Sequence, residues 1–165
     1  MTMASRTRAI VKSEGWAHMK VTVRCNDGTA LYPGMVVTRT GHTTPDVGRL
    51  DALGEMPFAV LGLPADQDID TNFTDNDEVV AYMIGSGAVV ALLLEDGHLV
   101  TSGEKLFASN QDNGYVTPLH HEASMSMNAA SLATILPRLA RSYVGRAMET
   151  LGSYASVQIV WAALV

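Results

Sequence analysis

Turn signals punctuate this sequence at short intervals, and that spacing restricts its fold more than any other feature. They stand at Asn26-Asp27-Gly28, Pro33-Gly34, Glu95-Asp96-Gly97 and Asp112-Asn113-Gly114. Asp-Gly and Asn-Gly pairs supply the positive φ that tight turns need. Intervals of roughly 8–12 residues leave room for short strands, but not for the long helices that alternate with strands in parallel α/β folds. The pattern therefore predicts a mainly β fold, either a barrel or a sandwich.

The segments between the turns have strand character. From His18 to Cys25, apolar and polar residues alternate, as they do in a half-buried strand. Further strands are expected at 35–40, 57–61, 79–84, 88–94, 98–101, 141–150 and 154–165.

One segment has helical spacing instead. Residues 128–136 carry apolar side chains at helical intervals, with Asn128 as the N-cap, and Pro137 is expected to end or kink the helix. Residues 1–15 are polar, basic and aperiodic. We therefore expect a single compact β-barrel or β-sandwich domain at 16–165. A flexible, extended N-terminal arm at 1–15 would precede it, and it would contain one short helix near 128–136.

Charge is distributed unevenly along the chain. The net charge is -6, which has the wrong sign for a domain built to bind nucleic-acid phosphates. Residues 1–49 carry +4, residues 50–122 carry -12 and residues 123–165 carry +2. Either this is ordinary scatter of surface charge, or the molecule has two faces with different partners. We favour the second interpretation, with the acidic stretch exposed to solvent and the basic start turned toward a partner.

No segment has the character of a membrane span or a secretion signal. The most apolar stretch, residues 79–94, is shorter than the roughly 20 residues that a membrane helix needs. It is also interrupted by Gly85-Ser86-Gly87, which favours two strands joined by a turn. The first twelve residues contain no apolar run of signal-peptide length. We expect no membrane partner.

The acidic stretch contains a pattern that is typical of calcium loops. Asp66, Asp68, Asp70 and Asp77 could offer oxygen ligands from one compact segment, as a hard cation requires. Two departures weaken the pattern, since Thr71 stands where a glycine is expected and Asp77 where a longer glutamate is expected. A solvated acidic loop is the alternative, and we favour it. We expect no cofactor.

Residues that could support catalysis are few. His120 and His121 would point to opposite faces of a strand, so they cannot easily share one metal ion. The only cysteine, Cys25, excludes a disulfide framework and fits a small core residue better than a nucleophile. Glu95 and Asp96 are expected to be solvent-exposed in a turn. A small hydrolase built around the histidines is the weakest alternative, and we expect no enzymatic activity.

Two segments late in the chain resemble a known family. Gly103-Glu104-Lys105-Leu106-Phe107-Ala108-Ser109, followed by Asp112 to Val116, precedes Val144-Gly145-Arg146-Ala147-Met148-Glu149 and a terminal strand from Val157 to Val165. This order resembles the capsid decoration (cement) proteins of tailed bacteriophages and archaeal tailed viruses with HK97-type capsids. Met56 to Val60, with Gly62, resemble the strand that opens the same core.

The resemblance implies a structural virion protein. Such a protein would bind the outer surface of an assembled capsid as a homotrimer and stabilise it by bridging major capsid protein subunits. Arg6, Arg8 and Lys12 are then the candidates for capsid contact. The alternative is a stand-alone β-barrel binding module, with calcium dependence through the four aspartates above.

Overall fold

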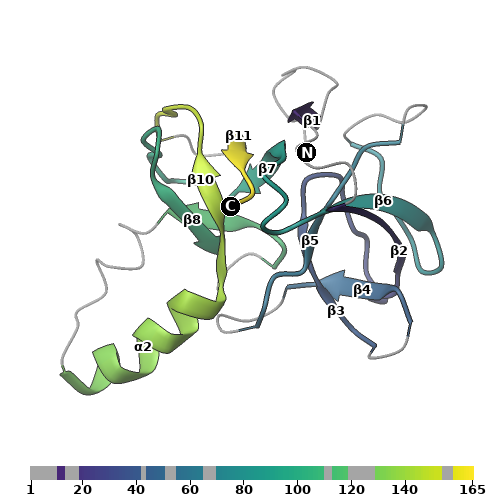
Figure 1. Cartoon of the computed structure of the whole chain (residues 1–165), viewed down its shortest axis with the longest axis horizontal. Coiled ribbons are helices and arrows are strands. Elements are labelled where there is room, and N and C mark those ends of the chain that lie inside the picture. The colour runs from purple at the N-terminus through teal and green to yellow at the C-terminus, as the bar shows by residue number, and fades with distance from the viewer. Residues whose placement is uncertain are drawn as a thin grey trace.

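The computed structural model is mainly β, with one short helix, as the sequence predicts (Figure 1). It describes residues 11–13, 19–41, 44–50, 55–64, 70–109, 113–118, 129–153 and 158–165. The strands are β1 (Val11–Ser13), β2 (Lys20–Cys25), β3 (Val36–Arg39), β4 (Asp46–Arg49), β5 (Ala59–Leu61), β6 (Glu78–Met83), β7 (Val89–Leu94), β8 (Lys105–Ala108), β9 (Val116–Pro118), β10 (Tyr143–Ala147) and β11 (Gln158–Ala163). The helix is α2 (Ala129–Arg141).

Strands β2 to β6 form a closed barrel with the order β2-β4-β3-β5-β6. The alternation predicted for β2 is confirmed, because Val23 and Cys25 are buried inside the barrel while Thr22 is exposed. Strand β4 was not expected from its sequence, since only Val47 among its four residues is strongly apolar. It lies between β2 and β3, and its pairing with β2 is parallel.

The remaining strands form a second sheet, in the order β1-β7-β11-β10-β8-β9. A further pairing of Leu94 with Val116 joins β7 to β9, so that β7, β11, β10, β8 and β9 follow one another in a ring. Strand β1 lies outside this ring at the edge and includes residues 11–13 of the predicted arm. The strand expected at 98–101 is wrong, because only Val100 pairs there, as an isolated bridge to Leu151.

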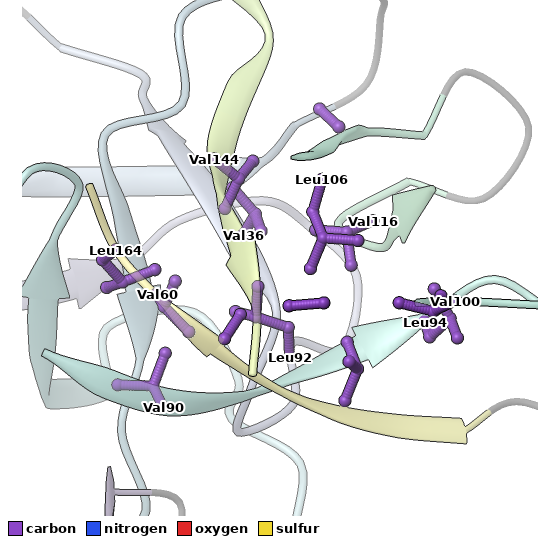
Figure 2. Packing of buried hydrophobic residues seen from close by; sticks show 14 of the residues in the cluster. Val36, Val60, Val90, Leu92, Leu94, Val100, Leu106, Val116, Val144 and Leu164 are labelled. Atoms are coloured by element: carbon purple, nitrogen blue, oxygen red, sulfur yellow. The ribbon is translucent and has the colours of Figure 1, made fainter. Parts of the chain in front are cut away.

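The barrel and the second sheet share their cores. Val36 and Val60 point out of the barrel and join the cluster that includes Leu92, Val144 and Leu164 (Figure 2). In return, Leu93 of the second sheet belongs to the barrel's cluster. Because successive residues of a strand point to opposite faces, each of these strands serves both cores.

Two glycines sit where the barrel and the second sheet meet. Gly34 has a φ of 84°, and a Cβ there would lie 3.0 Å from the Ala91 carbonyl oxygen. Its carbonyl accepts a hydrogen bond from the Leu93 N–H at 3.2 Å. Gly114, with a φ of 82°, donates its N–H to the Leu50 carbonyl at 3.1 Å. Main-chain hydrogen bonds therefore connect the two units where side chains would separate them.

The glycine turn after β6 joins the barrel to the second sheet. The sequence predicts two strands with a turn at 85–87, and both strands are present. They do not pair with each other, since β6 pairs with β2 and β5, whereas β7 pairs with β1, β9 and β11. The turn is thus the crossover between the two units.

Helix α2 extends beyond its predicted end. It runs through Pro137 to Arg141, so the expectation that this proline ends the helix is wrong. Proline removes one main-chain donor. The carbonyl that loses its partner belongs to Ala133, which is exposed and can bond to water instead. The end of the helix is closed by Ser142, whose hydroxyl donates to the Arg138 carbonyl at 2.7 Å.

Across the ranges given above, no helix is both long and apolar enough to cross a membrane.

Candidate functional site

The segments that carry the family resemblance lie side by side in the second sheet. Strand β8 pairs with both β9 and β10, and β10 pairs with β11. Segments that lie up to about fifty residues apart in the sequence are therefore neighbouring strands of one sheet. The strand expected to open this core, β5, belongs to the barrel instead, and Val60 is the residue through which it reaches the cluster of the second sheet.

The predicted capsid-contact residues lie mostly outside the described residues. Arg6 and Arg8 are outside them. Lys12 is the middle residue of β1, which pairs with β7 through Val11 opposite Val90 and Ser13 opposite Val89. The end of the predicted arm is therefore attached to the edge of the second sheet.

The predicted calcium ligands are only partly described. Asp66 and Asp68 lie outside the described residues, as do His120 and His121. Asp70 is exposed. In the part of the chain that is described, no group of three or more His, Cys, Asp or Glu side chains is arranged to hold a metal ion.

Asp77 makes contacts within its own loop. One of its carboxylate oxygens accepts hydrogen bonds from the Thr74 N–H at 2.7 Å and from the Thr74 hydroxyl at 3.2 Å. Two donors thus occupy one of the two carboxylate oxygens of Asp77.

The described part of the acidic stretch is fastened to one end of the barrel. A carboxylate oxygen of Asp75 accepts hydrogen bonds from the N–H groups of Asp27 and Gly28, both at 3.0 Å. These two bonds lower the pKa of Asp75. Nearby, Phe73 is buried and pairs with Leu31 through main-chain hydrogen bonds in both directions. The segment 70–78 is therefore attached to the barrel through Phe73 and Asp75, while its acidic side chains are exposed, as expected for a solvated acidic loop.

A pocket opens at this end of the barrel. Its volume is about 400 Å³, and it is lined by Gly28, Thr29, Ala30, Asn72, Thr74 and Asp75. Sequence analysis missed the pocket because its two halves come from loops more than forty residues apart. The signal available was Phe73, a large apolar residue within an otherwise polar stretch, which indicates that the loop is anchored.

Cys25, the last residue of β2, is buried. Burial raises the pKa of its thiol to about 11, and the nearby carboxylates of Asp77, Asp75 and Asp27 add to this effect. The thiol is therefore protonated at neutral pH and is a poor nucleophile. This confirms the prediction of a core cysteine.

Two ion pairs reinforce the barrel walls. Arg24 of β2 donates to both carboxylate oxygens of Asp46 on β4, with the Nη2–Oδ2 distance at 3.0 Å. Together with the Thr44 hydroxyl at 2.8 Å, it lowers the pKa of Asp46 to about 2. Arg49 pairs with Asp27 at 2.8 Å between Nε and Oδ2. The first pair joins the two strands whose main chains run parallel.

The second sheet buries one carboxylate that was expected to be exposed. Glu95 is only 3% exposed, so that expectation is wrong, whereas Asp96 is exposed as predicted. The carboxylate of Glu95 accepts a hydrogen bond from the buried Ser109 hydroxyl at 2.9 Å and lies 3.7 Å from His98 Nε2. The side chain folds inward because these polar partners replace water.

Helix α2 projects away from both sheets (Figure 1). Leu139 anchors its C-terminal end and is 7% exposed, whereas Leu136 is 56% exposed.

No protein-family model matches the chain. A search of the curated proteins also finds no match.

Proposed function

We propose that this chain is a structural protein of a viral capsid surface, which binds the assembled shell and stabilises it by bridging major capsid protein subunits. The proposal includes assembly as a homotrimer on the outside of the virion. The observation that carries it is the arrangement of the segments that resemble decoration proteins. They form adjacent strands β8 to β11 of one sheet, with β7 completing their core.

The fold also suits attachment to a surface. The barrel and the second sheet share buried side chains and main-chain hydrogen bonds, which gives a stiff body. One segment of the barrel is strongly acidic at its surface, because Asp70, Asp75, Asp77 and Glu78 are exposed there. A bridging protein needs distinct surfaces for distinct neighbours. The basic residues Arg6, Arg8 and Lys12 supply the proposed contact with the shell.

Binding to shells tests the proposal directly. Purified full-length protein is mixed with expanded, decoration-free capsids and sedimented, and the bound fraction is measured against concentration. We expect saturable binding and shells that withstand higher temperatures than undecorated ones. Absence of binding at saturating concentration would overturn the proposal.

A charge variant tests the contact residues. Replacing Arg6, Arg8 and Lys12 together by serine removes three positive charges, so shell binding should weaken and depend less on salt. Lys105→Ser removes an exposed positive charge from β8 and serves as the control, with binding close to that of the parent. Equal binding by the triple variant and the parent would exclude the arm as the contact.

A further inference from the structure

The exposed side of α2 forms a continuous apolar stripe. Ala133, Leu136, Pro137 and Ala140 are all exposed, and their spacing places them on one face of the helix. We call these four residues the apolar stripe. Arg138 and Arg141 are exposed beside it, and the thirteen residues of α2 include no acid. The helix therefore offers an apolar surface bordered by positive charge.

The end of the barrel that holds the pocket offers a concave surface beside negative charge. The pocket of about 400 Å³ described above is lined by Gly28, Thr29 and Ala30 on one side and by Asn72, Thr74 and Asp75 on the other, so that its wall mixes apolar and polar groups. Asp75 is the acid among the lining residues, and Asp70, Asp77 and Glu78 are exposed on the same segment of the chain. An apolar side chain could enter the pocket while arginines beside it meet the carboxylates.

One chain cannot bring these two surfaces together. Figure 1 shows α2 projecting on the side of the molecule away from the barrel, beyond β8 and β10. A contact between the stripe and the pocket must therefore join two copies of the chain. Such a contact uses different surfaces on the two partners, so it can be repeated from copy to copy and closes into a ring if the rotation permits.

We propose that α2 of one copy inserts its apolar stripe into the acid-rimmed barrel pocket of a second copy. Leu136 is the central apolar contact, and Arg138 and Arg141 face the acids around the pocket. The contact would supply the subunit interface of the homotrimer and in that respect rests on the proposed function. Its test uses the protein alone, so the two proposals can fail separately.

Sedimentation velocity over a range of concentrations provides the first test. We expect the parent to self-associate and to do so more weakly at high salt, because charge attraction is screened. Leu136→Asp should weaken self-association about 10- to 100-fold, as expected for the loss of one buried leucine. Leu99→Asp is the matched control, since Leu99 is 50% exposed but lies in the second sheet's loop region. A monomeric parent, or equal effects of the two variants, would overturn the proposal.

Complementation between two variants provides the second test. Thr29→Arg fills the pocket and adds a positive charge to it, while leaving α2 intact. At a concentration just sufficient to associate the parent, each variant alone should be mainly monomeric. An equimolar mixture of Leu136→Asp and Thr29→Arg should form a dimer at that concentration, because one intact helix and one intact pocket remain. A mixture that stays monomeric would overturn the proposal, as would continued self-association of Thr29→Arg alone, which would indicate helix-to-helix contact.

Two further measurements keep these outcomes interpretable. Circular dichroism and thermal unfolding must match the parent for each variant, and Arg141→Glu replaces Leu136→Asp if that variant fails to fold. If the parent is monomeric and Leu136→Asp loses shell binding, α2 faces the capsid. That result would overturn the contact between copies and leave the proposed binding to the shell standing.

Discussion

The barrel and the second sheet each have a buried apolar cluster, but they differ in the polar contacts that accompany it. The barrel holds the Arg24–Asp46 and Arg49–Asp27 ion pairs on its wall and the Asp75 hydrogen bonds at its end. The second sheet depends on a large aliphatic cluster built from every strand of its ring. Each strand of β7 to β11 contributes at least one fully buried apolar side chain.

This difference predicts which changes of condition or sequence alter the stability of each unit. Ion pairs respond to pH and salt, whereas aliphatic packing responds to the loss of side-chain volume. The two units nevertheless share Val36, Val60 and Leu93 across their boundary. We therefore expect different sensitivities but a single cooperative structure.

The largest effect should follow from removing a core leucine in either unit. Leu61→Ala in the barrel and Leu92→Ala in the second sheet should each lower the free energy of unfolding by about 2–5 kcal/mol, because each opens a cavity in a fully buried cluster. Urea unfolding followed by tryptophan fluorescence measures this. Both variants should keep one transition, shifted to lower urea.

Cys25 offers a second measure of the same coupling. Its buried thiol should label slowly in the native protein, and labelling should accelerate when the barrel opens. If the units are coupled, Leu92→Ala will accelerate labelling as Leu61→Ala does, and Leu99→Ala will not. Two separate transitions, or acceleration by Leu61→Ala alone, would show that the units unfold independently.

The turn and alternation pattern was sufficient to predict a β fold but not its topology. The strands at β2, β3, β5, β6 and β7 were predictable because turn residues and apolar alternation are local signals. The assignment of β6 and β7 to different sheets was not, because pairing is decided by long-range packing. Strand β4 was missed for the same reason, since a sequence of Asp46-Val47-Gly48-Arg49 becomes a strand only through its neighbours and the pair with Arg24.

The candidate site was even less accessible from sequence. Burial of Glu95 depends on Ser109, fourteen residues away, and the barrel pocket depends on loops that meet only in the folded chain. The exposed stripe of α2 follows from the continuation of the helix through Pro137. In each case the decisive contact or conformation lies outside the local pattern.

A smaller effect should follow from removing the partner of the buried carboxylate. Ser109→Ala leaves Glu95 without the hydroxyl that donates to it, at an expected loss of about 1–3 kcal/mol because a buried acceptor loses a donor. Thermal unfolding measures the loss, and the exposed Ser102→Ala is the control. If both serine variants unfold like the parent, polar contacts in the second sheet contribute little, and the contrast with the barrel becomes sharper.

The smallest effect that we predict is a loss of stability in acid, and it should originate in the barrel. Asp46 has its pKa lowered from 3.8 to about 2 by its hydrogen bonds to Arg24 and Thr44. A lowered pKa in the folded state means that the ionised carboxylate stabilises the fold above about pH 4, and that this stabilisation is lost as the pH falls toward 2. Asp46→Asn should therefore be less stable than the parent at neutral pH, and the difference should shrink between pH 4 and pH 2.

Unfolding curves collected across that pH range measure the effect. Asp96→Asn, which changes an exposed carboxylate and leaves the Arg24–Asp46 pair intact, is the matched control. If the stability difference between the parent and Asp46→Asn stays constant down to pH 2, the ion pair does not stabilise the barrel. The two units would then differ only in which residues they contain. The polar contacts of the barrel would contribute no stability beyond that of its apolar core.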